Sequence, residues 1–126
     1  MFTVRVKDYF SSAHFLREYR GKCEKIHGHN WRVEVELFSD SLDKEGMVVD
    51  FSKLKKVLKK VLLELDHSFL NKLSYFRKKN PTSENIALLI FEKMSRRLSS
   101  CRHIKRMKVY VWEQENSCAT FEQDLP

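Results

Sequence analysis

Hydrophobic and polar residues alternate in two N-terminal segments, residues 2–7 and 31–37. A period of two is typical of a strand that turns one face to the core. The first strand is expected to extend towards His14 with a break around Asp8, and the second to continue an extended run that begins at His27. The sequence therefore predicts a pair of N-terminal strands.

A helix is predicted after the turn-forming segment 39–47. Apolar residues from Leu54 to Leu65 recur at three- and four-residue steps, as on the buried face of an amphipathic helix. Asp66 and His67 come directly after the last of these residues. Because the end of a helix can present side chains into a cleft, this position favours a functional role for both residues.

A second helix is predicted over the apolar positions from Ile86 to Leu98. Pro81 and the hydroxyl residue that follows it, Thr82, mark the start of this helix. Glu84 then complements the dipole of the first turn. Capping therefore accounts for Thr82 and Glu84 without any role in binding.

Two further strands are predicted near the C-terminus. Residues 107–113 alternate, which places Glu113 on the same face as the apolar residues of this strand, and the chain returns over 118–122 after a turn at 114–116. The resulting order predicts an α+β fold (ββααββ), a four-stranded antiparallel sheet with two helices on one face. Such a sheet leaves two edges that must be paired or covered, so we expect a homo-oligomer.

The composition indicates a single domain over residues 1–126. Hydrophobic residues make up 42% of the chain and aromatic residues 12%, which is enough for one core but not for two. The chain has no apolar run of about 18 residues, and its first residues carry charges where a signal peptide is apolar. We therefore expect a cytoplasmic protein without a membrane segment. The 3 cysteines, an odd number, do not form a disulfide framework.

The net charge of +7 favours anionic partners. The basic residues are scattered along amphipathic elements, as in KKVLKK and RKK, without a nucleic-acid-binding module or a stacking aromatic motif. We therefore expect no nucleic-acid partner. A small phosphate ester that enters a locally basic cleft matches this charge better.

The main candidate chemistry lies in His14, Cys23, His27 and His29. Alternate residues of a strand share a face, so His27 and His29 can converge on one metal ion, with His14 reaching it from a neighbouring strand. Three imidazoles hold Zn²⁺ and leave one tetrahedral position open for chemistry. Cys23 could instead be a fourth ligand, which would close the site as a structural one.

Further ionisable residues favour a catalytic site over a structural one. Asp66 is adjacent to His67, and Glu113 adds a second carboxylate, which is more than a structural zinc site needs. The ordinary alternative for Glu113 is an exposed side chain at the end of a strand.

Six segments of the chain carry a family resemblance, namely SSAHFL, CEKIHGHNWRVEV, GMVVDF, LDHSFLN, PTSEN and WEQENSCATF. By these segments, which span nearly the whole chain, the sequence resembles the pterin synthases, the 6-pyruvoyltetrahydropterin synthase family. The resemblance implies the tunnelling fold, in which subunits join their sheets into a barrel, usually in a hexamer with active sites between subunits. It also implies Zn²⁺ on the three histidines and 7,8-dihydroneopterin triphosphate as the substrate.

The resemblance implies a catalytic role for four residues. Cys23, close to a dication, would be partly a thiolate and act as the base. Asp66 would orient His67, whose imidazole shuttles a second proton. Glu113 would anchor the guanidine-like edge of the pterin through paired hydrogen bonds.

Other substrate contacts are less defined by the resemblance. Thr82 and Glu84 would contribute to the pterin pocket, where capping explains them equally well. The residues that bind the triphosphate are unassigned, although Arg17, Lys22 and Lys25 are near the site in the sequence.

The spacing of the thiol indicates which reaction the resemblance implies. Cys23 precedes His27 by four positions, which resembles the bacterial 6-carboxy-5,6,7,8-tetrahydropterin synthases of queuosine biosynthesis, zinc-dependent lyases that release acetaldehyde and triphosphate. The pyruvoyl enzymes usually have a wider spacing, and they eliminate triphosphate without cleaving the carbon chain. A third alternative is a non-catalytic zinc or nucleic-acid-binding module.

Overall fold

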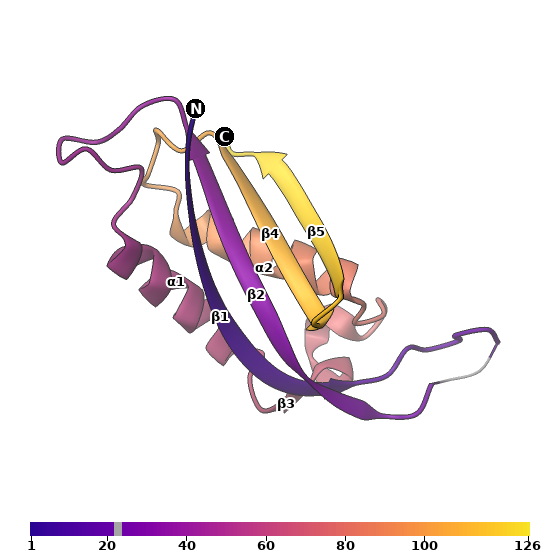
Figure 1. The fold of residues 1–126 in the computed structure, drawn as a ribbon. Coiled ribbons are helices and arrows are strands. Elements are labelled where there is room, and N and C mark those ends of the chain that lie inside the picture. Colours follow the sequence, from indigo (N-terminus) through magenta and orange to yellow (C-terminus); the bar gives the residue numbers. More distant parts are fainter. Residues whose placement is uncertain (22–23) are drawn as a thin grey trace.

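The computed structural model describes residues 1–21 and 24–126. It has two layers, a twisted sheet and two helices that lie against one of its faces (Figure 1). The chain order of the elements is β1 (Phe2–His14), β2 (His27–Ser39), α1 (Phe51–Leu63), β3 (Ser68–Phe69), two short 3₁₀ helices (Leu70–Lys72 and Ser74–Phe76), α2 (Ser83–Arg97), β4 (Arg106–Gln114) and β5 (Ser117–Asp124). The predicted order of the long strands and helices is confirmed.

The four long strands form an antiparallel sheet in the order β1-β2-β4-β5. The pairing of β1 with β2 runs without interruption from Phe2 opposite Ser39 to His14 opposite His27. The predicted break around Asp8 is therefore wrong. The backbone hydrogen bonds between β1 and β2 do not depend on the type of side chain, so the strand continues through Asp8. The Asp8 carboxylate accepts a hydrogen bond from the backbone N–H of the next residue.

The sheet contains a fifth strand, so the prediction of a purely antiparallel four-stranded sheet is corrected to a mixed one. β3 pairs in parallel with β1 at Ser12 and Ala13. Just before β3, the His67 backbone N–H donates to the Ser11 carbonyl, and His67 itself has a positive φ of 52°. This left-handed turn brings the chain back against β1. Two residues are too short a run to show a period of two in the sequence.

Both helices begin at a capping side chain. The Asp50 carboxylate accepts from the backbone N–H of Ser52 at the start of α1, and the Thr82 hydroxyl accepts from that of Asn85 at the start of α2. The capping prediction for Thr82 is thus confirmed. None of the helices in the described residues is long and apolar enough to cross a membrane.

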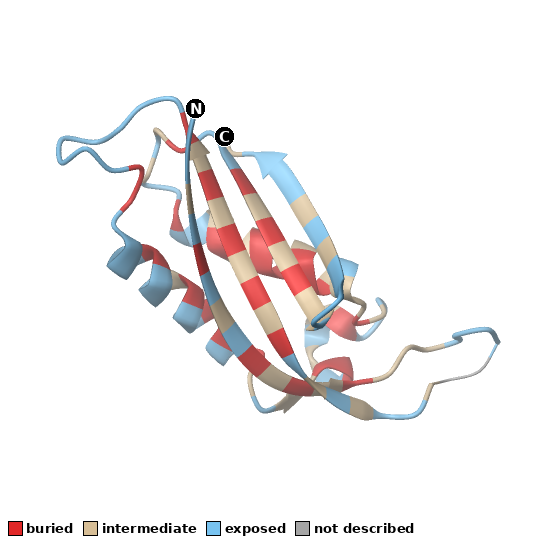
Figure 2. Cartoon of the chain, viewed as in Figure 1, coloured by how far each residue is buried: buried red, intermediate tan, exposed pale blue. Residues whose placement is uncertain are grey.

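The core lies between the sheet and the helices. Alternate residues of β2 and β4 are buried, as the banding in Figure 2 shows. On β2 the buried row runs from Leu37 to Trp31 and then reaches His29 and His27, which are partly exposed. Because side chains two apart share a face, these histidines extend the core face beyond the helices. The candidate site therefore lies at one end of the core.

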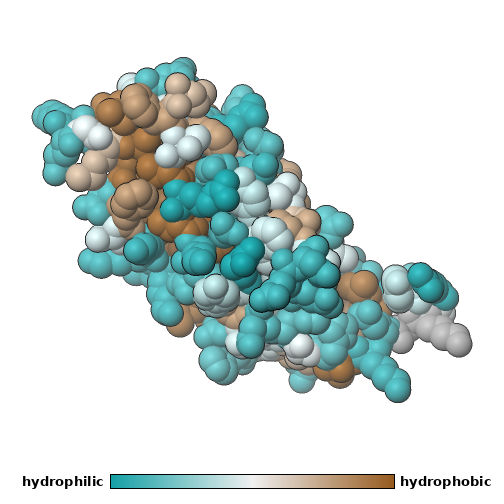
Figure 3. All heavy atoms as spheres, in the orientation of Figure 1, coloured by the Kyte–Doolittle hydropathy of each residue, from teal (hydrophilic) through white to brown (hydrophobic). Residues whose placement is uncertain are grey.

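The opposite end of β1 carries an exposed apolar patch, which Figure 3 shows at the end of the molecule where this strand begins. Its members are large hydrophobic residues, each at least 37% exposed: Met1, Phe2, Leu42, Met47 and Phe51. β3 pairs with β1 at Ser12 and Ala13, far from the patch. Among the described residues, the part of β1 beside the patch is therefore an open edge of the sheet. β5 forms the other edge.

Candidate metal centre

The three predicted histidines converge on one point. His14 ends β1 and His27 begins β2, and the register places them directly opposite each other. His29 follows on the same face of β2, because it is two residues further along the strand. The Nε2 atoms of His14 and His27 are 3.0 Å apart, and His14 as a whole is only 2% exposed. The predicted convergence is confirmed.

Backbone carbonyl groups orient two of these rings. Nδ1 of His14 lies 2.8 Å from the Pro81 carbonyl oxygen, and Nδ1 of His27 lies 2.9 Å from the Lys25 carbonyl oxygen. A carbonyl only accepts, so each Nδ1 carries the hydrogen and each neutral ring has its lone pair on Nε2. Two lone pairs that face each other across 3.0 Å repel unless a cation lies between them.

His29 supplies a second sign of a cation. Its Nε2 is buried without a hydrogen-bond partner among the described residues. Although the Glu113 Oε1 atom is 2.8 Å away, this contact lacks hydrogen-bond geometry. Burial lowers the pKa of His29, which the Glu113 carboxylate opposes and the other two imidazoles reinforce. The low pKa favours the neutral ring, which is the form that binds metal.

Glu113 brings a carboxylate into the same cluster. Trp112 pairs with Cys118 and Gln114 with Ser117, so Glu113 is the extra residue of a β-bulge. A bulge redirects a side chain, and Oε1 here lies 3.3 Å from Nε2 of His14. One ligand atom from each of the four residues lies within 4.8 Å of the others.

These separations fit a bound metal ion. With bonds of about 2.0 Å, a tetrahedral ion holds its ligand atoms about 3.3 Å apart. The distance between Nε2 of His14 and that of His27, and the distances from Glu113 Oε1 to the three Nε2 atoms, range from 2.8 to 3.9 Å, and all the ligand atoms lie within 4.8 Å of one another. The cluster of His14, His27, His29 and Glu113 can therefore bind a metal ion.

Trp31 supports this cluster and was not singled out from the sequence. It is fully buried, and its ring centroid lies 4.9 Å from that of His14 and 5.3 Å from that of His29, edge to face in both cases. Its Nε1 donates to the Ser12 carbonyl at 3.3 Å. The period of two that places His27 and His29 on one face also places Trp31 there, so the sequence pattern could have identified Trp31 as a neighbour of the histidines. The Pro81 carbonyl carried no comparable signal.

Asp66 and His67 lie at the edge of the sheet, outside the cluster. Asp66 Oδ1 accepts from the Ser11 backbone N–H at 2.8 Å, which is the main reason that its pKa is lowered. Its Oδ2 lies 2.9 Å from Nδ1 of His67, whose side chain is 84% exposed. The predicted pairing of carboxylate and imidazole is present. Among the described residues the pair makes no contact with the histidine cluster.

The remaining predicted site residues divide between α2 and the segment before β2. Thr82 caps α2 and directly follows Pro81, so its backbone adjoins the partner of His14. Glu84 is exposed in the first turn of α2. Cys23 lies outside the described residues.

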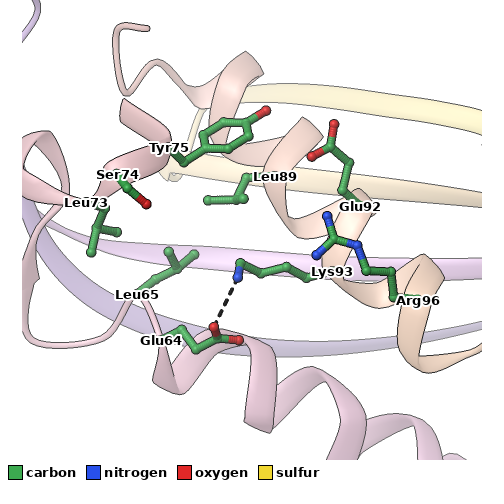
Figure 4. A pocket seen from close by; sticks show the side chains of 9 residues that line it. All are labelled: Glu64, Leu65, Leu73, Ser74, Tyr75, Leu89, Glu92, Lys93 and Arg96. Carbon is green, nitrogen blue, oxygen red and sulfur yellow. Dashed lines mark hydrogen bonds and ion pairs between the residues drawn. The ribbon is translucent and has the colours of Figure 1, made fainter. Parts of the chain in front are cut away.

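A cavity of about 420 Å³ lies between the end of α1, the 3₁₀ helices and α2 (Figure 4). Glu64 and Lys93 face each other across it in an ion pair of 3.0 Å. Glu92 and Arg96 add one further charge of each sign. None of the predicted site residues that the structure describes lines this cavity.

Comparisons with known proteins agree with the fold. Residues 3–124 match the 6-pyruvoyl tetrahydropterin synthase family. A 6-carboxy-5,6,7,8-tetrahydropterin synthase of Haemophilus influenzae is 30% identical over 145 residues, covering 98% of this chain and 100% of its own. A dihydroneopterin monophosphate aldolase of Pyrococcus furiosus is 40% identical over 104 residues, covering 82% of each chain. The solved structure of 6-pyruvoyl tetrahydropterin synthase from Caenorhabditis elegans superposes with a TM-score of 0.80 at 28% identity, covering 97% of this chain and 95% of that one.

Proposed function

The chain belongs to the 6-pyruvoyl tetrahydropterin synthase family, and on this premise we propose that it converts 7,8-dihydroneopterin triphosphate to 6-carboxy-5,6,7,8-tetrahydropterin. Acetaldehyde and triphosphate are released, and the product serves queuosine biosynthesis. Water enters the reaction, and the two electrons lost by the side-chain carbons reduce the pterin ring, so no external oxidant is required. The observation that carries the proposal is the convergence of His14, His27 and His29.

These three histidines would hold Zn²⁺, since their neutral imidazoles suit this ion. When bound, Zn²⁺ supplies a Lewis acid that polarises the hydroxyl groups of the substrate side chain. The carbonyls of Pro81 and Lys25 keep the rings of His14 and His27 in the required tautomer.

Glu113 would anchor the pterin. A carboxylate accepts two parallel hydrogen bonds from the guanidine-like edge of the ring, a geometry that fixes orientation. Without substrate its Oε1 lies 2.8 Å from His29, so the carboxylate must turn from the cluster to meet the pterin. Thr82 and Glu84 would contribute to the same pocket, since Thr82 adjoins the Pro81 carbonyl that contacts His14.

Proton transfer would fall to Cys23, Asp66 and His67. We assign Cys23 as the base at the side-chain carbons, and the Asp66 carboxylate holds the Nδ1–H tautomer of His67. Nε2 of His67 is then free to accept or return a proton. Because the His67 side chain is 84% exposed in one chain, a second copy is needed to enclose it.

We therefore propose a homo-oligomer, a hexamer by analogy with the family, with sites between subunits. Two observations support association. In the part of the chain that the structure describes, both edges of the sheet are open over most of their length, and the exposed apolar patch at Phe2 and Phe51 adjoins one of them. Sheets joined at their edges would form the barrel.

Product analysis tests the reaction. Purified, zinc-loaded protein is incubated anaerobically with 7,8-dihydroneopterin triphosphate, and acetaldehyde, triphosphate and the pterin mass are measured together. We expect acetaldehyde and triphosphate in equal amounts. Release of triphosphate without acetaldehyde would instead indicate the pyruvoyl-type elimination. The proposal would be overturned if the protein converted neither this triphosphate ester nor the corresponding monophosphate.

A second candidate is an aldolase, because the Pyrococcus furiosus relative is 40% identical and named for the monophosphate. Aldol cleavage would leave the phosphate on the departing two-carbon aldehyde. The same assay, run with 7,8-dihydroneopterin monophosphate, distinguishes the two, since acetaldehyde carries no phosphate.

A further inference from the structure

We propose that a basic cavity beside the metal centre binds the polyphosphate tail of the substrate, an inference that rests on the proposed function. The cavity has a volume of about 500 Å³, within the usual range of small-molecule sites. It is lined by two segments far apart in the sequence: Phe15, Arg17 and Glu18 on one side, and Arg77, Lys78 and Asn80 on the other.

The cavity is held in shape by two asparagine side chains. Asn71 accepts from the Phe15 backbone N–H at 2.9 Å and donates to the Phe15 carbonyl, also at 2.9 Å. Asn80 does the same for Arg17, at 2.7 and 3.1 Å. Each amide thus satisfies both backbone groups of one residue. The two walls are joined before any ligand binds, which lowers the entropic cost of binding.

Arg17 is itself fixed by this arrangement. Its guanidinium donates to the carbonyl groups of Lys79 and Asn71, at 3.1 Å each. These two bonds use two of its five N–H groups, so three can still donate to an anion. An arginine held in this way pays little further entropy when it binds phosphate.

The charge of the cavity selects an anion. Arg17, Arg77 and Lys78 line the cavity, and Glu18 is the one acidic residue among the described residues that line it. Within residues 1–21 and 24–126, none of these three cations takes part in an ion pair. The cavity of Figure 4 differs, since two acidic side chains there balance two basic ones. Unpaired cations in a concave site attract phosphate most strongly.

The two walls of the cavity are close in the chain to residues of the metal centre. Phe15 follows His14 directly, and Asn80 precedes Pro81, whose carbonyl accepts from His14. One wall therefore begins one residue from a member of the metal cluster, about 3.8 Å along the backbone, and the other begins one residue from the carbonyl that contacts His14. A ligand with its hydroxyl groups at the cluster can extend a phosphate tail into the cavity. Three cations suit a triphosphate better than a monophosphate, because the longer tail carries more negative charge.

Calorimetric binding of inorganic triphosphate to the full-length protein tests the proposal without turnover. Arg77→Ala/Lys78→Ala should weaken binding at least about tenfold, since two charged contacts are lost. Glu18→Gln should tighten it about two- to fivefold. Inorganic phosphate should bind more weakly than triphosphate to the wild type. For the ester substrate, the double variant should raise KM, while inhibition by unphosphorylated 7,8-dihydroneopterin stays unchanged.

The matched control is Lys55→Ala/Lys59→Ala, which removes the same charge from the exposed face of α1. It should bind triphosphate as the wild type does. Equal weakening in both double variants would mean a response to net charge alone and would overturn the proposal, as would wild-type affinity in the Arg77/Lys78 variant. The proposed reaction fails separately, through the product assay, since inorganic triphosphate binding requires no pterin chemistry.

Discussion

Mixed oligomers of two inactive variants test where the active site is completed. His29→Ala removes a member of the metal cluster, and His67→Ala removes the imidazole at the sheet edge. Loss of a general acid–base group lowers turnover about 10²- to 10⁴-fold, so His67→Ala alone should retain about 1% activity or less. His29→Ala should also be inactive, because it removes a proposed metal ligand. In the structure the two positions belong to separate groups, so each substitution spares the other half of the site.

The size of the rescue follows from subunit statistics. If a site combines the cluster of one chain with the Asp66–His67 pair of its neighbour, then in a 1:1 mixture half of the chains have an intact cluster and half of the neighbours an intact pair. About one quarter of the sites are then intact, and activity should return to about 25% of wild type. If each chain completes its own site, no site is intact.

The assay measures acetaldehyde release from 7,8-dihydroneopterin triphosphate. The variants carry different affinity tags and are unfolded together, refolded and purified over both tags, so that only mixed oligomers remain. A mixture of His29→Ala with His14→Ala is the matched control, because both substitutions damage the same half of the site. Mixed His29→Ala and His67→Ala oligomers that stay at the level of this control would refute the shared site.

Three further outcomes are expected. His29→Ala should lose bound metal while His67→Ala keeps it, as measured by metal analysis of the purified variants; near-stoichiometric zinc in the first would contradict the ligand assignment. Thr82→Ala should lower the free energy of unfolding by about 1 kcal/mol, because the cap of α2 is lost, whereas Thr82→Ser should lower it by less, in urea titrations. The Ser11 amide lowers the pKa of Asp66, so its contribution to stability is present above about pH 4 and is lost as the pH falls through the lowered pKa. The stability difference between wild type and Asp66→Asn should therefore shrink below about pH 4, and a difference constant down to pH 2 would exclude this linkage.

The sequence by itself determined the long elements and the face on which the histidines lie. A strand or an amphipathic helix is specified by side chains a few residues apart, so the periods of residues 31–37 and 54–65 identify β2 and α1 without reference to the rest of the chain. The same period places His27 and His29 on one face. The Thr82 cap is equally local, because a hydroxyl group reaches the N–H groups of the next turn.

Only the tertiary structure decided which distant groups meet. The Pro81 carbonyl that orients His14 is 67 residues away, and the bulge that brings Glu113 to the imidazoles depends on the pairing of β4 with β5. The two-residue strand β3 is likewise fixed by backbone contacts with Ser11 rather than by a pattern of its own. Such contacts depend on how the whole chain packs. Many sequences with the same local pattern of hydrophobic and polar residues could form different long-range contacts. The chemistry of the candidate site could therefore be predicted from its residue types, while its geometry was determined by the packing of the whole chain.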